Sequence, residues 1–177
     1  MRFIGDPNRF AFEIGDYQCP NHSLRHVDIW AGGVRLCIDD NSVYLDQFTN
    51  DLADEIKRSY CINDFALYLG RLTPVEMATF VCSTREKNSP NYDIEGDSIY
   101  PFYRFLDLGP TTDNLSAFLF REAERSFFVY SFWRDASRKG LAETFQVVEL
   151  DFNEIISVAK DAMNTLLAML PGNSGCA

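Results

Sequence analysis

The sequence predicts an α+β fold, in which helices pack on a mainly antiparallel sheet within a single domain. Two patterns lead to this prediction: strand-like stretches are joined by short turns, and helical stretches follow groups of strands instead of alternating with each one. The third observation is size, because 177 residues with 46% apolar content can bury one core without metal or disulfide support. We expect the domain to span residues 1–170 and residues 171–177 to form a flexible tail.

The first predicted strand covers residues 10–14. Phe10, Phe12 and Ile14 alternate there with Arg, Ala and Glu, which is the period of a strand with one buried face. The preceding Gly5-Asp6-Pro7 is typical of a turn, because proline fixes its own φ and favours extended geometry in the residue before it.

Two further strands are predicted at residues 25–30 and 34–38. The Gly32-Gly33 pair between them suits a turn or a bulge, since glycine tolerates positive φ. Asp39-Asp40-Asn41 is typical of a hairpin tip, so we expect it to lead into a strand at residues 42–44.

Helices are predicted in the middle of the chain. Asn50 can cap a helix that runs from residue 51 to about residue 60, with acidic residues early and basic residues late, as the helix dipole prefers. Thr73-Pro74-Val75-Glu76 is a capping box with proline at the first helical position, which predicts a helix over residues 74–82. Residues 83–96 are polar and rich in turn formers, so we expect an exposed loop.

The second half predicts a hairpin, a further strand and a final helix. The hairpin strands are expected at residues 115–122 and 126–133, and both are apolar on both faces, which is typical of strands covered on two sides. Another strand is expected at residues 141–150. Asp151-Phe152-Asn153-Glu154 then begins a helix with an apolar stripe, which Pro171-Gly172 ends.

Charge and composition limit the classes of partner. The net charge of −10 opposes contact with nucleic acid or an anionic membrane and favours a basic partner, although an acidic surface also serves solubility. No apolar run approaches the roughly 18 residues that cross a bilayer. The five cysteines are odd in number and scattered, and the N-terminus lacks a signal segment, so we expect a cytoplasmic protein with reduced thiols.

Cys19, His22 and His26 form the strongest candidate metal pattern. They are ligands that zinc prefers and lie close together, but no fourth ligand is evident nearby, so we favour an ordinary loop and strand start. The sequence contains neither a glycine-rich phosphate loop nor the serine elbow of hydrolases. We therefore expect no metal, no cofactor and no catalytic residues.

Acidic and aromatic residues in irregular segments are candidate contacts to a partner. Tryptophan and tyrosine are enriched at binding hot spots, and an acidic loop complements a basic surface. The predicted partner-binding residues are Trp30, Asp39, Asp40, Tyr92, Asp93, Glu95, Asp97 and Tyr100. Two alternatives stay open here: the carboxylates form a solvated surface, or a pair of them serves a hydrolase.

Several short motifs follow one another near the N-terminus: Gly5-Asp6-Pro7, Phe10-Ala11, Trp30, Gly33 and Cys37-Ile38-Asp39-Asp40. In this order they resemble the immunity protein 42 family of bacterial polymorphic-toxin systems. The resemblance implies a small cytoplasmic protein that binds a cognate toxin domain tightly, spares the producing cell and does no chemistry of its own. If the toxin is a basic nuclease, the acidic protein would be steered to it.

Two other function classes compete with this resemblance. A non-catalytic cytosolic adaptor or protein-interaction domain fits the acidic α+β composition equally well, and a toxin gene immediately upstream would separate the two. A hydrolase that uses a carboxylate pair is the third class, and loss of turnover on alanine substitution of Asp93 and Glu95 would favour it.

Overall fold

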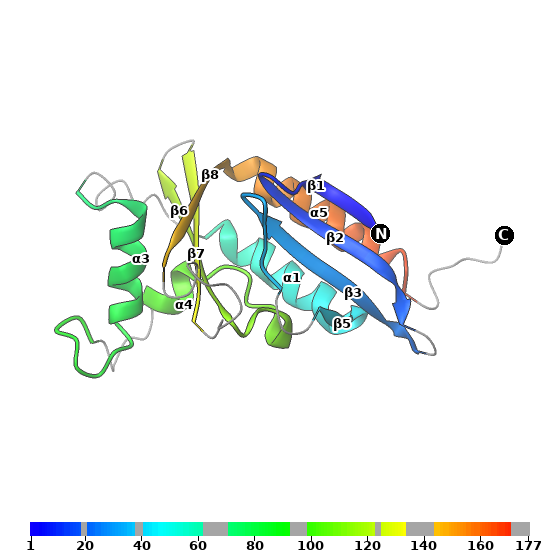
Figure 1. Cartoon of the computed structure of the whole chain (residues 1–177), viewed down its shortest axis with the longest axis horizontal. Coiled ribbons are helices and arrows are strands. Elements are labelled where there is room, and N and C mark those ends of the chain that lie inside the picture. The colour runs from blue at the N-terminus through cyan, green and yellow to red at the C-terminus, as the bar shows by residue number, and fades with distance from the viewer. Residues whose placement is uncertain are drawn as a thin grey trace. The chain divides into compact units, whose positions relative to one another are not determined.

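The structure is a computed structural model that describes residues 1–18, 21–37, 41–61, 71–92, 99–122, 125–133 and 144–170. Its described strands form two sheets, and every pairing between them is antiparallel (Figure 1). The predicted α+β class with antiparallel sheets is therefore confirmed. No helix among the described residues has both the length and the apolar character needed to cross a membrane.

The chain forms two compact units, and neither is a continuous segment. The first unit contains residues 1–57, 107–114 and 153–177, and the second contains residues 58–106 and 115–152. The single domain over residues 1–170 stays a prediction, and the predicted tail lies outside the described residues.

The first unit contains a five-stranded sheet. Its strands are β1 (Arg2–Asp6), β2 (Phe10–Gln18), β3 (Asn21–Ala31), β4 (Val34–Arg35) and β5 (Ser42–Tyr44). Strands β1 to β4 lie in chain order, and β5 also pairs with β3. The predicted strand at residues 10–14 is confirmed within the longer β2. Strand β1 was not predicted, because its apolar residues Phe3 and Ile4 are adjacent instead of alternating.

Two glycine-containing turns join these strands as predicted. The Arg9 amide donates to the Asp6 carbonyl oxygen at 2.9 Å, which closes the first turn. Gly5 just before it has a φ of +91°, and a Cβ there would collide with the Phe10 carbonyl oxygen. Gly32-Gly33 connects β3 to β4 with φ values of +57° and +79°, the conformation that two-residue hairpin loops require.

The predicted hairpin at Asp39-Asp40-Asn41 is wrong in its partner. Strand β5 pairs with β3, through Arg25 and Val43, and not with β4. The long β3 therefore has β2 along one edge, and β4 and β5 one after the other along the other edge. The eleven residues of β3 leave room for both short strands. Asp39 and Asp40 themselves lie outside the described residues.

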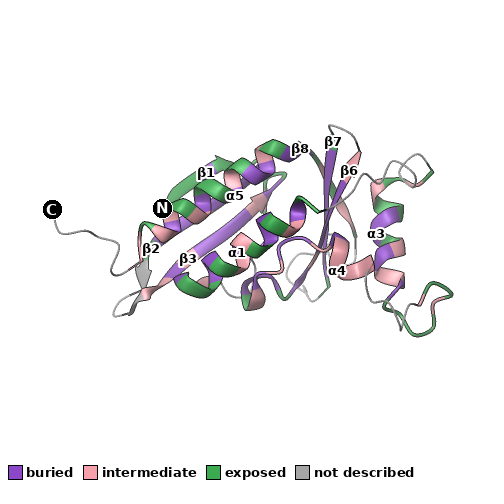
Figure 2. Cartoon of the chain, turned by 180° about the vertical axis from the view of Figure 1, so that it is seen from behind, coloured by how far each residue is buried: buried purple, intermediate pink, exposed green. Residues whose placement is uncertain are grey.

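Helices α1 (Leu45–Ser59) and α5 (Phe152–Leu167) lie on one face of this sheet (Figure 1, Figure 2). The predicted start of α1 at residue 51 is wrong, and Asn50 lies exposed inside the helix instead of capping it. The buried stripe of Leu52 and Ile56 extends back through Leu45 and Phe48, so the helix begins at Leu45, nearly two turns earlier.

The core of the first unit lies between the sheet and these helices. Phe10, Phe12 and Ile14 are buried as predicted, and the Phe12 ring meets that of Phe48 on α1 edge to face at 6.5 Å. Burial of each large apolar side chain stabilises the fold by about 1.5–3 kcal/mol. Because side chains alternate along a strand, residues of the opposite parity on β2 point away from this core.

The second unit contains a three-stranded sheet in the order β6 (Leu115–Glu122), β7 (Arg125–Phe132), β8 (Gln146–Asp151). The predicted β6–β7 hairpin is confirmed, and β7 is central and almost wholly buried. Strand β6 is an edge strand with one isolated bridge beyond it, between Arg104 and Phe118. Strand β8 begins at residue 146 and not at 141, since residues 144–145 are not in a strand.

The second unit also contains α3 (Pro74–Ser83) and α4 (Ile99–Tyr103). The capping box predicted for α3 is confirmed, because the Thr73 hydroxyl accepts from the Glu76 amide at 3.2 Å while the Glu76 carboxylate accepts from the Thr73 amide at 2.7 Å. These hydrogen bonds lower the pKa of Glu76. Residues 85–88 after the helix are exposed, as predicted for this loop, and residues 93–98 lie outside the described part.

Candidate functional site

The face of the five-stranded sheet opposite α1 and α5 is the candidate site, and we call it the outer sheet face (Figure 1). Pairing places its residues together: Glu13 on β2 lies opposite both Phe3 and Asp28, and Trp30 on β3 lies opposite Arg35. Residues that are paired in register point to the same side of a sheet. The outer sheet face is defined by Phe3, Glu13, His26, Asp28, Trp30 and Arg35.

An aromatic pair occupies one part of this face. The Phe3 and Trp30 rings meet edge to face with centroids 6.0 Å apart, and 46% of Phe3 is exposed. The Trp30 indole Nε1 donates to Oε2 of Glu13 at 3.0 Å, which fixes the orientation of the ring. An oriented, half-buried tryptophan beside an exposed phenylalanine presents apolar area at little entropic cost, as binding hot spots do.

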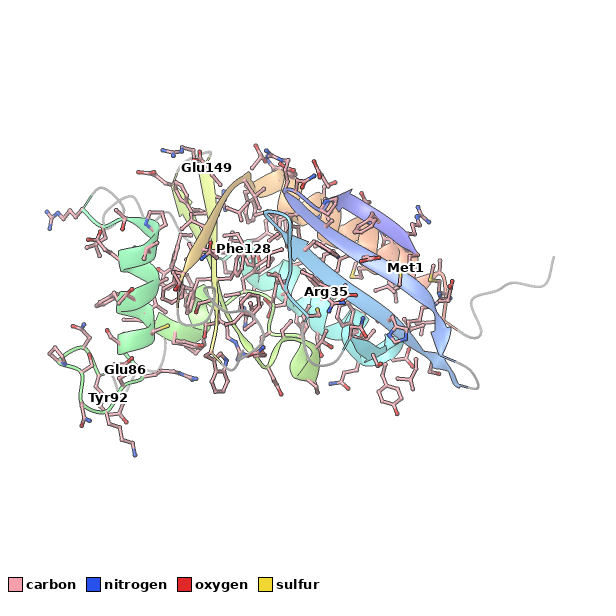
Figure 3. All side chains as sticks on the ribbon, in the orientation of Figure 1. Met1, Arg35, Glu86, Tyr92, Phe128 and Glu149 are labelled. Carbon is pink, nitrogen blue, oxygen red and sulfur yellow. The ribbon has the colours of Figure 1, made fainter. Side chains whose placement is uncertain are left out.

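A polar chain runs along β3 beside the aromatic pair. The Asn41 side-chain amide donates to Oδ2 of Asp28 at 2.9 Å, so its oxygen is the atom that faces Nδ1 of His26 at 2.9 Å. Because that oxygen only accepts, Nδ1 of His26 carries the proton. The Arg35 guanidinium lies 3.7 Å from Oδ2 of Asp28, and Arg35 itself is visible on this side of the sheet (Figure 3).

Asp28 is the buried member of the polar chain. Asp28 is only 6% exposed, and its Oδ1 has no hydrogen-bond partner among the described residues. A buried carboxylate oxygen without a donor is costly, so the contact with Arg35 and the hydrogen bond from Asn41 compensate this charge only in part. Asp28 therefore keeps an incompletely compensated negative charge within the sheet at the outer face.

The described partner-binding residues that were predicted belong to different units. Trp30 lies on the outer sheet face of the first unit, whereas Tyr92 and Tyr100 belong to the second unit. Tyr92 lies in the loop after α3 (Figure 3). Tyr100 packs edge to face on Phe118 at 5.5 Å, the Arg85 guanidinium lies 4.3 Å from its ring centroid, and burial raises its pKa. The contacts of Tyr100 are those of a packed side chain.

The predicted acidic residues Asp39, Asp40, Asp93, Glu95 and Asp97 lie outside the described residues. The described residues next to these two acidic groups in the chain belong to different units. Asn41, directly after the first pair, takes part in the polar chain of the outer sheet face.

Sequence reasoning missed Phe3, Glu13, Asp28 and Arg35. A signal for Asp28 was present, because residues 26–31 alternate polar or aromatic residues with apolar ones, which predicts a second, non-core face. The remaining residues join it only through strand pairing, which is not visible in a local pattern.

The alternative zinc pattern is only partly described. Cys19 lies outside the described residues and the side chain of His22 is not described, while the His26 ring contacts Asn41. Within the described ranges no group of three or more His, Cys, Asp or Glu side chains is placed to hold a metal ion.

The sequence profile of the family described as immunity protein 42 matches residues 1–165. The chain belongs to the immunity protein 42 family. The resemblance of the N-terminal motifs is thus confirmed, and the chain is an immunity protein against a bacterial toxin. Membership favours this function over the adaptor alternative.

A solved structure supports the fold. The chain is similar to CdiI from Burkholderia dolosa, whose crystal structure matches with a TM-score of 0.67 at 17% sequence identity. The match covers 93% of this chain and 99% of that one. At this identity the likeness bears on the fold alone. No curated protein matches the sequence.

Proposed function

We propose that this immunity 42 protein inhibits its cognate toxin by stoichiometric binding through the outer sheet face, without catalysis of its own. The observation that carries the proposal is the Phe3–Trp30 pair, held by Glu13 on a sheet face opposite both α1 and α5. In the first unit the apolar core accounts for the other face, so packing within the sheet and these helices does not explain the aromatic pair.

Charge indicates the chemistry of the toxin surface. The net charge of −10 favours a basic partner and speeds its diffusional encounter. A nuclease toxin fits this charge, because a surface that binds nucleic acid is positive. On such a surface the protein would compete with the nucleic-acid substrate while binding none itself.

The predicted acidic residues extend this proposal. Asp39 and Asp40 precede Asn41, and we expect them to contact basic side chains beside the outer sheet face. Asp93, Glu95 and Asp97, with Tyr92 directly before them in sequence, are proposed as a second group of toxin contacts, whereas the packed ring of Tyr100 is left out of it.

The experiment is co-expression with the product of the gene immediately upstream, scored by growth rescue and by co-purification. The proposal expects rescue, a stable complex of fixed stoichiometry, and about 30-fold weaker binding for Trp30→Ala, equivalent to about 2 kcal/mol. Trp133→Ala is the matched control, because Trp133 is 51% exposed and lies in the second unit. Equal affinity of both variants and the wild type would overturn the proposed face, and absence of rescue would overturn the pairing with this toxin.

A further inference from the structure

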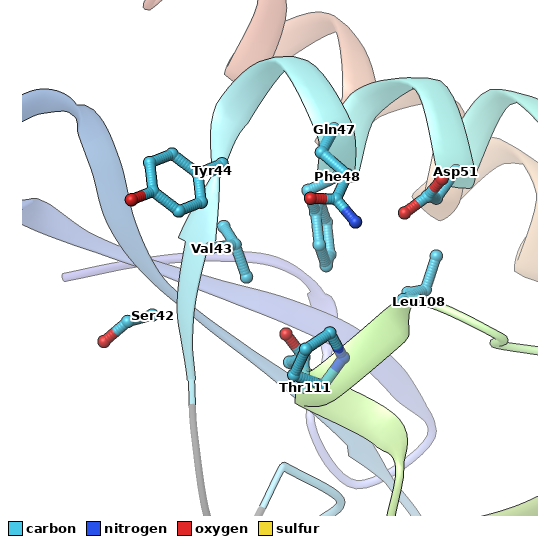
Figure 4. A pocket seen from close by; sticks show the side chains of 9 residues that line it. Ser42, Val43, Tyr44, Gln47, Phe48, Asp51, Leu108 and Thr111 are labelled. Carbon is cyan, nitrogen blue, oxygen red and sulfur yellow. The ribbon is translucent and has the colours of Figure 1, made fainter.

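A small cavity lies at the β5 edge of the sheet in the first unit. It has a volume of about 150 Å³ and lies between β5, the first turns of α1, and η1 (Gly109–Thr112). Figure 4 shows Gln47, Phe48 and Asp51 along α1, with Leu108 and Thr111 across from them.

Register shows which side of the sheet the β5 residues of this cavity face. Ser42 on β5 pairs with His26, so both side chains are on the side of the sheet that carries the outer face. The neighbouring Val43 is buried on the other side and forms part of the cavity wall. A partner seated on the outer sheet face and extending past β5 would therefore reach the mouth of the cavity.

The wall of the cavity combines apolar side chains with polar ones, such as Ser42 and Thr111, and with one charged group. Val43, Phe48 and Leu108 supply apolar surface, and Asp51 supplies a carboxylate that accepts a hydrogen bond from the Gln47 side chain. Tyr44 at the cavity is 57% exposed, which leaves its ring available to a partner. This combination suits a side chain with an aliphatic stem and a cationic end.

Negative charge accumulates around Asp51. Partial burial raises the pKa of Asp51, and the like charges of Asp107 and Asp54 raise it further. The charges of Asp107 and Asp54 thus disfavour the ionised Asp51 in the free protein, and a cation at Asp51 would relieve this repulsion.

Size excludes most other occupants. Pockets for cofactors and drug-sized ligands usually enclose about 300–1,000 Å³, whereas a cavity of about 150 Å³ accommodates a group as large as benzene. One side chain of a protein partner is therefore the occupant that fits.

We propose that this cavity receives one lysine or arginine side chain of the toxin, with its stem against Val43 and Phe48 and its charged end at Asp51. The inference rests on the proposed function, because it presumes that the toxin binds this protein. It adds a second, electrostatic contact to that of the aromatic pair, so that the two together define how the toxin is oriented.

The test measures the affinity of the purified upstream-encoded toxin for Asp51→Asn, with Asp161→Asn as the matched control. Asp161 is exposed on α5 of the same unit and lies outside the cavity, so its loss changes the net charge equally. We expect binding to weaken 10- to 100-fold for Asp51→Asn and less than about 2-fold for Asp161→Asn. The difference between the two variants should shrink at high ionic strength.

Two outcomes would overturn the cavity proposal: unchanged affinity of Asp51→Asn, or equal weakening by both variants, which would indicate general charge steering. If Trp30→Ala still weakens binding in either case, the proposed function stands without the cavity. If the wild-type protein does not bind the toxin, the proposed function itself fails. A charge exchange completes the test, since Asp51→Arg should recover binding when the matching toxin lysine or arginine becomes aspartate.

Discussion

The Trp30 indole on β3 donates a hydrogen bond to the Glu13 carboxylate on β2 at 3.0 Å. The two residues are diagonal neighbours on the outer sheet face, because Glu13 is paired with Asp28 and Trp30 with Ala11. Bonds of this kind to a charged acceptor are stronger than neutral ones, and here one fixes the ring that the Phe3 side chain contacts. The carboxylate thus positions the aromatic pair.

This relationship predicts that Glu13→Ala weakens toxin binding by acting through Trp30. We expect about a 5-fold loss of affinity for Glu13→Ala and near wild-type affinity for Glu13→Gln, whose amide oxygen still accepts the bond. Calorimetric titration of single and double variants measures the coupling, and the losses from Glu13→Ala and Trp30→Ala should not add. Glu149→Ala is a control at an exposed strand position of the second unit. Simple additivity would contradict the positioning role of Glu13.

Phe12 is predicted to be a main determinant of stability in the first unit. It is fully buried and its ring meets both Phe10 and Phe48, so Phe12→Ala removes apolar contacts and leaves a cavity. We expect a loss of about 3–5 kcal/mol in the free energy of unfolding, measured by urea denaturation. Phe3→Ala is the control on the outer sheet face and should cost less than about 1 kcal/mol, because Phe3 is half exposed. Equal losses would contradict the assignment of the two faces.

Gly5 is predicted to be required by both its φ and its surroundings. Gly5→Ala would place a Cβ against the Phe10 carbonyl oxygen and close to the Val158 side chain, in a backbone conformation with φ of +91°. Gly33 is a matched control, since its φ is +79° but the nearest atom to an added Cβ is at an ordinary 3.6 Å. We expect Gly33→Ala to cost about 1 kcal/mol and Gly5→Ala at least about 2 kcal/mol in thermal or urea denaturation. The reverse order would contradict a steric role for Gly5.

Local signals account for the parts of the fold that the sequence predicted well. The capping box of α3 lies within four residues, and the β6–β7 hairpin joins two apolar segments that are adjacent in the chain. Neither depends on distant parts of the chain. The start of α1 was wrong because Asn50 is a favourable cap by residue type, but burial of Leu45 and Phe48 decides where the helix begins.

Pairing between strands limits what the sequence predicts about the candidate site. Trp30 was identified by residue type and by an expected place near an irregular segment, although it lies in β3, whereas Glu13 and Asp28 join it through the register of β2 with β3. The strand at residues 42–44 was assigned to the wrong neighbour for the same reason. Register depends on which faces are buried together, and that is a property of the whole sheet.

Cys37 is predicted to be chemically inert in the folded protein. It is 1% exposed, and burial raises its pKa to about 12, so little thiolate forms near neutral pH. Among the described cysteines, Cys61 is exposed and should react before Cys37. Mass spectrometry after brief alkylation should find Cys61 modified and Cys37 protected until denaturant is added. Rapid modification of Cys37 in the native protein would contradict its buried position.

Asp51 is predicted to destabilise the free protein, which makes its binding effect separable from misfolding. Its folded-state pKa is raised, so the native state binds a proton more tightly than the unfolded state does, and ionisation near pH 7 opposes folding. Asp51→Asn removes this penalty. We therefore expect the variant to be at least as stable as the wild type at pH 7, although it binds the toxin less tightly.

The size of this stability difference between Asp51→Asn and the wild type depends on pH. As the pH falls from about 7 to about 3, past the ordinary aspartate pKa of about 3.9, the wild-type carboxyl becomes protonated and its penalty disappears. The stability advantage of Asp51→Asn should therefore shrink over this range, and urea denaturation of both proteins at several pH values measures it. Asp161→Asn serves as the control and should show no comparable trend. A variant that is less stable than the wild type at pH 7 would contradict the electrostatic repulsion around Asp51, on which a cationic occupant of the cavity depends.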